Sequence, residues 1–150
     1  MIRKSTRRDF IKHSSAIGAA LWVGGPKVFS AEKSPNERIR YACIGASGKG
    51  QSDSSDAADH GDVVAIVDVD DLNRRKRKAD DRFKNAEEFD DYRKLFDTFA
   101  DKFDAVTVST PDHNHFLATA LAITHGKGAF CQKPLTHSVW EARELARLAK

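Results

Sequence analysis

The stretch Ile44-Gly45-Ala46-Ser47-Gly48-Lys49-Gly50 follows a short apolar run at residues 39–44, and this order indicates a strand running into a glycine-rich turn. Gly45 and Gly50 occupy the first and last positions of the pattern G-x-G-x-x-G, and we expect a helix over residues 48–59. Such a turn places backbone amides at a helix N-terminus, where they bind a pyrophosphate that glycine allows to approach closely. The stretch therefore predicts a nucleotide-binding α/β domain.

The turn departs from the pattern at its middle position, where Ser47 stands in place of glycine and Gly48 is adjacent. A side chain there opposes close approach, although a serine hydroxyl is itself able to donate to a phosphate. A plain strand-to-helix turn stays an alternative on these residues. The predicted cofactor-binding positions in the turn are Gly45, Ala46, Ser47, Gly48 and Gly50.

Strands and helices alternate along the rest of the chain. Further strands are predicted at residues 63–67, near Phe89, at 105–108 and at 129–131, the last as a short buried strand. Helices are predicted at 71–83, 92–96, 115–124 and after Ser138, where Glu141 completes a capping box. This alternation predicts a doubly wound, mostly parallel, Rossmann-like sheet over residues 39–150, preceded by a linker at 32–38.

Asp68 ends the second predicted strand, 23 positions after Gly45. At this place an acid accepts hydrogen bonds from the ribose hydroxyls of adenosine, and its charge repels a 2′-phosphate, so NAD is favoured over NADP. The basic run at residues 74–78 offers NADP an alternative. We interpret that run as a solvated helix face balanced by nearby acids.

The loop Ser109-Thr110-Pro111-Asp112-His113-Asn114-His115 follows the fourth predicted strand and so lies at the ligand edge of such a sheet. Ser109, Thr110 and Pro111 are predicted to contact the cofactor, and His115 to contact the nicotinamide or the substrate and to take part in proton transfer. A polar loop that caps the next helix is the alternative. No metal site is predicted, because two histidines two positions apart lack a third ligand.

The phrase Gln132-Lys133-Pro134 ends the last predicted strand. A lysine at that place, beside a nucleotide, is suited to proton transfer, so Lys133 is the first catalytic candidate and Gln132 a cofactor contact. A surface lysine is the alternative.

Cys43 and Cys131 lie on the first and fifth predicted strands. The fourth strand separates these two in a doubly wound sheet, which puts them roughly 9–10 Å apart, too far for a disulfide. Both are predicted to be buried thiols.

The chain has the length of about one domain, with 150 residues, and its composition is that of an ordinary globular protein. The formal net charge of +3 comes from residues 1–31, which hold six basic residues and one acid. The other residues number 19 basic and 21 acidic, so no electrostatic case for a nucleic-acid partner remains. No apolar run approaches the roughly 20 residues of a membrane anchor.

Residues 1–31 have the anatomy of an export signal: a basic segment, a short apolar segment at 16–23 and a polar exit. Ser5-Thr6-Arg7-Arg8-Asp9-Phe10-Ile11-Lys12 is similar to a twin-arginine signal. A basic amphipathic helix is the alternative. We therefore expect export to the periplasm by the twin-arginine machinery, which carries folded proteins, and hence a tightly held cofactor regenerated within the catalytic cycle.

Taken together, residues 37–150 resemble the glucose-fructose oxidoreductase / inositol dehydrogenase / MocA family. The resemblance rests on Thr110-Pro111-Asp112 with His115, and on Gly126-Lys127-Gly128 leading to Gln132-Lys133-Pro134. It implies that Lys133 lies beside the nicotinamide and helps catalysis. The family's phrase usually has Glu where this chain has Gln132, which removes a negative charge beside the lysine.

The resemblance also implies a C-terminal α/β domain that this chain lacks, and a full-length form that is a homo-oligomer. We expect the whole protein to be a nicotinamide-dependent oxidoreductase of a sugar or polyol, and the 150 residues by themselves to be inactive. An NAD-dependent glycoside hydrolase of the same family and a non-catalytic nucleotide-binding fragment are the alternatives.

Overall fold

The computed structural model describes residues 38–150, which form a five-stranded parallel sheet with the strand order β3-β2-β1-β4-β5. The strands are β1 (Ile39–Ile44), β2 (Gly61–Val67), β3 (Glu87–Phe89), β4 (Ala105–Val108) and β5 (Gly128–Cys131). The helices are α2 (Lys49–His60), α3 (Asp71–Lys78), α4 (Tyr92–Phe99), α5 (His115–Thr124) and α6 (Val139–Leu148). This confirms the predicted doubly wound α/β fold.

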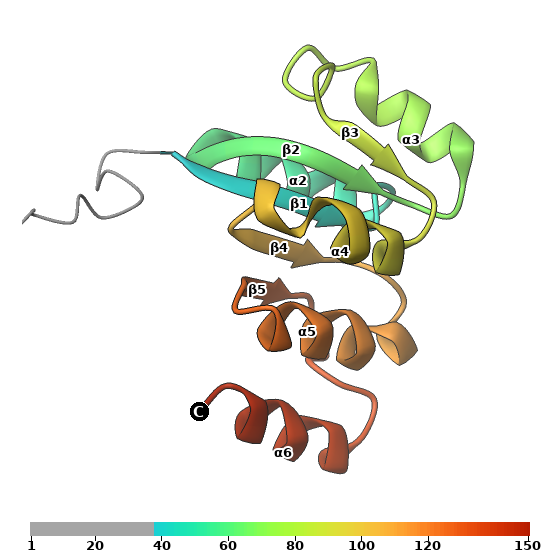
Figure 1. The fold of residues 1–150 in the computed structure, drawn as a ribbon. Helices are drawn as coiled ribbons and strands as arrows, with labels where there is room; N and C mark the ends of the chain where they lie inside the picture. The colour runs from blue at the N-terminus through green and yellow to red at the C-terminus, as the bar shows by residue number, and fades with distance from the viewer. Residues whose placement is uncertain (1–37) are drawn as a thin grey trace, which may run out of the picture. The chain divides into compact units, whose positions relative to one another are not determined.

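Helices cover both faces of the sheet, with α2 behind it and α4 and α5 in front (Figure 1). Alternating residues of one strand enter different layers: Ala42 and Ile44 pack with residues of α4 and α5, whereas Cys43 packs with Ala57 of α2. Because each central strand is covered on both faces, its inner part is an apolar run rather than an alternating pattern, as at residues 41–44 of β1 and 63–67 of β2, which is why these strands could be predicted.

The carboxyl ends of the strands lie at the same edge, and backbone hydrogen bonds continue past them. The amide of Gly45 donates to Val67 at 2.8 Å, that of Ser109 to Ile44 at 2.8 Å, and that of Gln132 to Val108 at 2.9 Å. These backbone hydrogen bonds therefore fix the position of the first residue after β1, β4 and β5. This places all the sequence-predicted site segments along one edge of the sheet.

Helix α3 ends at Lys78, so it is shorter than the predicted range 71–83. The backbone then turns, and Phe83 is fully buried in the layer that holds α2. The basic run on α3 is also less solvated than predicted. Arg77 is 5% exposed, its guanidinium lies 3.9 Å from the centre of the Phe83 ring, and it donates to Ser55 Oγ at 2.6 Å.

The other predicted elements are all present, and the main differences concern β2, α4 and β5. Strand β2 begins at Gly61 instead of residue 63. Helix α4 continues to Phe99 instead of ending at 96, and its Leu95 and Phe96 are buried. Strand β5 begins at Gly128, and the prediction that it is buried is wrong: it is an outer strand of the sheet, and Phe130 is 56% exposed. Helix α6 has the predicted capping box between Ser138 and Glu141.

Both cysteines are free, as predicted, and β4 lies between their strands. Cys43 is fully buried. Cys131 is half-buried, contrary to prediction, because its strand is at the edge of the sheet.

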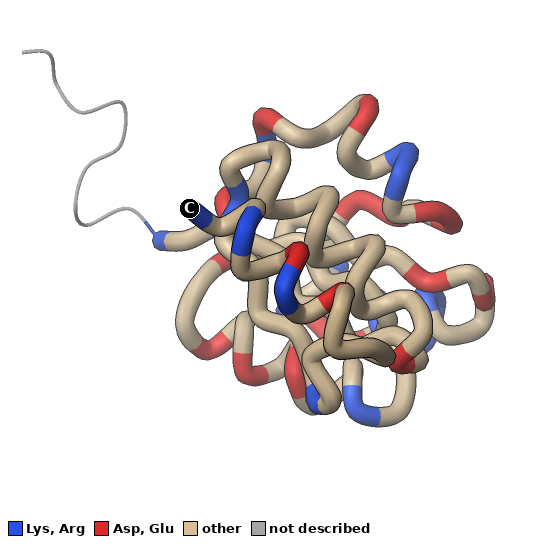
Figure 2. The backbone as a smooth tube through the Cα atoms, turned by 90° about the horizontal axis from the view of Figure 1, so that it is seen from below, with Lys and Arg blue, Asp and Glu red and all other residues tan. Residues whose placement is uncertain are grey.

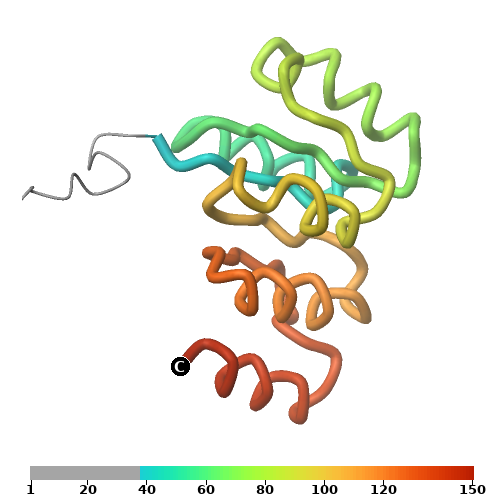
Figure 3. Tube along the Cα trace, viewed as in Figure 1, coloured from blue at the N-terminus to red at the C-terminus, as the bar shows by residue number. Residues whose placement is uncertain are grey.

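The predicted export signal and all of the linker except Arg38 lie outside the described residues. Within residues 38–150, acidic and basic positions are interspersed along the backbone (Figure 2). No helix in this part of the chain is long and apolar enough to cross a membrane. In the trace of Figure 3 the chain runs from α5 into β5, which pairs with β4, and then into α6, which ends near the C-terminus.

Candidate nucleotide-binding site

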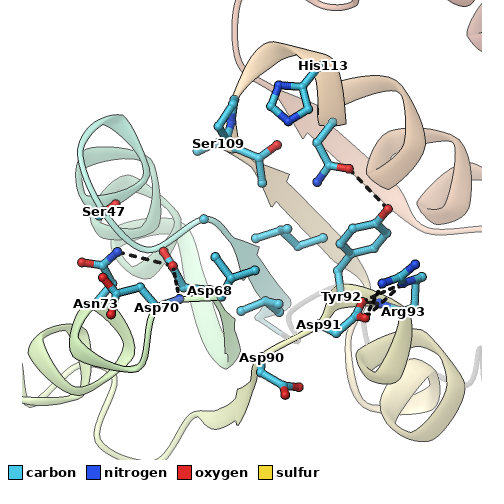
Figure 4. A pocket seen from close by; sticks show the side chains of 17 residues that line it. Ser47, Asp68, Asp70, Asn73, Asp90, Asp91, Tyr92, Arg93, Ser109 and His113 are labelled. Atoms are coloured by element: carbon cyan, nitrogen blue, oxygen red, sulfur yellow. Dashed lines mark hydrogen bonds and ion pairs between the residues drawn. The ribbon is translucent and has the colours of Figure 1, made fainter.

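A cavity of about 510 Å³ opens at the carboxyl edge of the sheet. Segments that follow β1, β2, β3 and β4 line it: Ile44, Gly45, Ser47, Val67–Asp70, Asn73, Asp90–Arg93, Ser109–Pro111, His113 and Asn114. Figure 4 shows Asp68, Asp70 and Asn73 on one wall, with Tyr92, Ser109 and His113 across the opening. The cavity therefore unites the glycine turn, the predicted ribose acid and the loop after β4.

The glycine turn has the backbone geometry that a close ligand requires. Gly45 has φ +93°, and a Cβ there would lie 2.7 Å from the carbonyl oxygen of Ser109. A Cβ on Gly50 would collide with the Gly45 carbonyl. Gly48 has φ +55° with open space around it, so the turn exposes backbone at the first turn of α2, where amides lack helical acceptors.

Asp68 is held rigidly at the end of β2. One carboxylate oxygen accepts from the Ala46 amide at 2.8 Å, and the other accepts from the Asp70 amide at 2.9 Å and Asn73 Nδ2 at 3.3 Å. A carboxylate has about four acceptor sites. Three are used, so the cavity side of Asp68 keeps capacity for a ribose hydroxyl.

The far wall of the cavity is built on helix α4. Asp91 caps that helix by accepting from the Arg93 amide at 2.9 Å, and Tyr92 Oη donates to Asn114 Oδ1 at 3.4 Å. Four acids line the cavity, namely Asp68, Asp70, Asp90 and Asp91. Asp90 and Asp91 are paired with Lys94 and Arg93, so the charge that disfavours a 2′-phosphate is that of Asp68 and Asp70, in agreement with the prediction of NAD.

A second cavity of about 260 Å³ adjoins the loop after β4. Its lining is Lys49, Ser109, Thr110, Asp112, His115, Gln132 and Lys133. The structure thus brings the two predicted loops together, and the exposed Lys133 lies on the cavity. Ser109 and Thr110 line both cavities, which makes the two spaces neighbours.

His115 is placed between the two loops and is 2% exposed. Its Nδ1 lies 2.6 Å from the Pro134 carbonyl oxygen and its Nε2 lies 2.7 Å from that of Thr110. Both ring nitrogens therefore contact backbone, and the ring ties the loop after β4 to the loop after β5. A part in proton transfer stays a prediction for His115.

Asp53 was missed by the sequence reasoning. It lies on α2, is 5% exposed, and accepts from Ser109 Oγ at 2.6 Å and from Gln132 Nε2 at 3.0 Å, while Lys49 Nζ lies 2.7 Å away. Burial raises the pKa of the Asp53 carboxyl, but the hydrogen bonds from Lys49, Ser109 and Gln132 outweigh it, so its pKa is below the ordinary value. Its i,i+4 spacing from Lys49 was the available signal.

Within residues 38–150, no group of three or more His, Cys, Asp or Glu side chains is arranged to hold a metal ion. The polar groups of the two cavities instead suit a dinucleotide: backbone amides for a pyrophosphate, a carboxylate for a ribose and a lysine beyond them.

Comparison with known proteins agrees with this geometry. Residues 39–150 match the GFO_IDH_MocA family, described as an oxidoreductase family with an NAD-binding Rossmann fold. No curated protein sequence matches the chain.

Solved structures with the same fold include three that were crystallised with a nicotinamide cofactor. An inositol dehydrogenase homolog from Azotobacter vinelandii, complexed with NAD⁺, is 32% identical with a TM-score of 0.64, and the match covers 76% of this chain and 32% of that one. An oxidoreductase from Agrobacterium radiobacter, in complex with NAD⁺, L-tartaric acid and magnesium, is 25% identical with a TM-score of 0.65. The match covers 75% of this chain and 32% of that one.

The third, the WlbA dehydrogenase of Bordetella pertussis in complex with NADH and UDP-GlcNAcA, is 16% identical with a TM-score of 0.66, covering 75% and 35%, and shows the fold. This chain spans about a third of the length of these proteins.

Proposed function

Because the chain belongs to the glucose-fructose oxidoreductase / inositol dehydrogenase / MocA family, we propose that the whole protein is an NAD-dependent oxidoreductase that acts on a sugar or polyol. One observation carries the proposal: the glycine turn, Asp68 and Lys133 lie along one edge of the sheet, in two neighbouring cavities. Across the sheet, Asp68 follows β2, the glycine turn follows β1 and Lys133 follows β5, which is the order of adenosine ribose, pyrophosphate and nicotinamide in a dinucleotide.

The residues that hold the cofactor follow from the cavities they line. Backbone amides at the start of α2 bind the pyrophosphate, with Ser47 beside them. Asp68 accepts from the adenosine ribose. Ser109 and Thr110 line both cavities, with Pro111 beside them in the first, so a nicotinamide that extends past them would enter the cavity that Lys133 lines.

When bound, NAD supplies the acceptor for a hydride from the carbon that bears the substrate hydroxyl. The chain's contribution is the proton: the amine of Lys133 takes the hydroxyl proton as the carbon–oxygen double bond forms. Gln132 and the His115-linked loops hold the backbone from which Lys133 projects. Proton transfer by a positioned side chain is worth typically 10²–10⁴-fold in rate, roughly the loss expected for Lys133→Ala.

A dehydrogenase is favoured over the NAD-dependent glycoside hydrolase because the similar structures with a stated activity are dehydrogenases. They include a UDP-N-acetylglucosamine 3-dehydrogenase from Acidithiobacillus ferrooxidans and a myo-inositol 2-dehydrogenase from Lactobacillus plantarum. A net redox change of the substrate separates the two activities.

The proposal includes export. Arg7 and Arg8, followed by Phe10 and Ile11, support transport through the twin-arginine machinery to the periplasm. A folded protein exported with its cofactor has no cytoplasmic NAD pool to draw on, so tight binding is proposed with it. The family resemblance supports the further proposal that the whole protein is a homo-oligomer. We expect that replacing Arg7-Arg8 by Lys-Lys abolishes export. Unchanged accumulation of the variant in the periplasm would contradict the proposed export route.

The function is tested by denaturing the purified full-length protein and identifying the released nucleotide by mass spectrometry. Stoichiometric NAD(H) is the expected result. Lys133→Ala then retains the nucleotide but loses turnover of sugars and polyols. A protein that neither releases nor binds NAD would overturn the proposal.

A further inference from the structure

The Asp53 carboxylate, buried beneath the second cavity, is bound by groups from three parts of the chain. Lys49 belongs to its own helix, Ser109 follows β4 and Gln132 follows β5. Asp53 is 5% exposed and carries these contacts through both oxygens. It therefore joins helix α2 to the ends of two strands at the edge where the cofactor site lies.

The contact with Asp53 fixes the direction of the Gln132 amide. A carboxylate accepts and does not donate, so the NH₂ group of Gln132 faces Asp53 and the oxygen faces away. That oxygen, Oε1, accepts from the backbone amide of Lys133 at 3.3 Å. A continuous path of contacts thus runs from the buried acid to the backbone of Lys133.

The two side chains are matched as an acid and an amide. A glutamate at position 132 would set a second carboxylate against Asp53 at hydrogen-bonding distance, and like charges in contact repel. Exchanging the two chemistries, with Asn at 53 and Glu at 132, restores one amide–carboxylate hydrogen bond with donor and acceptor exchanged, and the carboxylate at position 132 replaces Asp53 as the acid near Lys49. Ser109 keeps an acceptor in that arrangement, since the Asn oxygen replaces a carboxylate oxygen.

We propose that Asp53 is a positioning residue: through Gln132 it holds the segment from which Lys133 enters the site. Its bearing on catalysis rests on the function proposed above. The positioning itself is a property of the folded chain and is measurable without substrate.

The direct test is amide hydrogen exchange of Lys133, followed by NMR in the full chain. We expect Gln132→Glu to speed exchange about tenfold, because repulsion from Asp53 displaces the side chain whose oxygen accepts from the Lys133 amide, and Asp53→Asn to speed it less. The double variant Asp53→Asn/Gln132→Glu returns the rate towards that of the parent. Asp56→Asn, which removes an exposed acid from the same helix, is the matched control and leaves the rate unchanged.

Additive effects of the two changes, or no change at Lys133 in either single variant, would overturn the positioning role. Gln132→Met removes the amide without adding charge, and it carries the same expectation if Gln132→Glu does not fold.

In turnover assays of the full-length protein, Asp53→Asn and Gln132→Glu lower kcat more than they change KM for NAD, and each shifts the pH profile of kcat/KM. The double variant restores both. If the unmodified protein does not bind NAD, the proposed function is refuted. The amide exchange rates of Lys133 would still decide the positioning role of Asp53.

Discussion

The imidazole of His115 contacts the carbonyl oxygen of Pro134 at 2.6 Å, which fastens the start of helix α5 to the segment beyond strand β5. The same ring contacts Thr110 through its other nitrogen. A carbonyl oxygen accepts and does not donate, so a ring nitrogen that carries the proton donates to the carbonyl it contacts. The two loops of the second cavity are therefore held by one buried side chain.

Replacing His115 by Ala should destabilise the chain by about 2–3 kcal/mol, since a buried side chain is truncated and its contacts with two carbonyl oxygens are lost. Urea unfolding measures the change. His113→Ala is the control, because His113 is exposed on the same loop and its loss should have little effect. Equal stability of the two variants would show that the His115 contacts contribute nothing.

Gly45→Ala should cost more stability than Gly126→Ala. Both glycines have positive φ, but the Gly45 methyl would press on the Ser109 carbonyl, whereas Gly126 has nothing within 4 Å. We expect about 1–2 kcal/mol for Gly126→Ala from its conformation and a larger loss for Gly45→Ala. Thermal unfolding of the two variants makes the comparison, and an equal loss would contradict the close packing at the turn.

Asp68→Ala should weaken NAD binding by about tenfold, the value of one hydrogen bond to a charged group. NADP binding should fall less, because the same change removes a charge that repels the 2′-phosphate. Calorimetric titration with each nucleotide tests this in the full-length protein. Asp62→Ala, an exposed acid at the opposite end of β2, serves as control; a parallel loss for both nucleotides would count against a ribose contact.

Asp53 should make stability depend on pH in the acid range. Its pKa is lower in the folded than in the unfolded chain, so its contribution is present above the unfolded pKa of about 3.9 and is lost as pH falls through the folded value. Below about pH 4, the parent chain should therefore lose stability more steeply than Asp53→Asn. Parallel curves from urea unfolding at several pH values would exclude this contribution.

The two thiols should differ in reactivity. Burial raises the pKa of the Cys43 thiol to about 11, and that residue is fully buried, so it should not react in the folded chain. Cys131 is half-buried with its pKa also raised by burial, so it should react slowly. A thiol reagent in the folded state should modify one cysteine, and in urea both; rapid modification of Cys43 would be inconsistent with the packing around β1.

The features that the sequence predicted correctly are local ones. Ser138 and Glu141 are three positions apart, so the sequence alone indicates their capping box, and β1, β2 and β4 are each short, mostly apolar runs. The position of β5 at the edge of the sheet is not a local property, which is why the same kind of apolar run gave a wrong prediction of burial there.

The parts of the site that were missed depend on distant pairings. Asp53 contacts Gln132, 79 positions away, and no sequence pattern around either residue indicates this pairing. Arg77 sits in a run of five basic residues, but the turn after Lys78 brings Phe83 beneath it and buries it. A run of charged residues predicts solvent exposure on average, but contact with the Phe83 ring buries Arg77 within such a run.

The central place of β1 in the sheet has a thermodynamic consequence. Gly45 meets Ser109 only when β4 has paired with β1, and Asp68 reaches the Ala46 amide only when β2 has paired on the other side. A partly folded chain therefore lacks the site, and a nucleotide binds the native state alone. NAD at a hundred times its Kd should then raise the free energy of unfolding by about 2.7 kcal/mol, which makes the cofactor a global stabiliser of the fold.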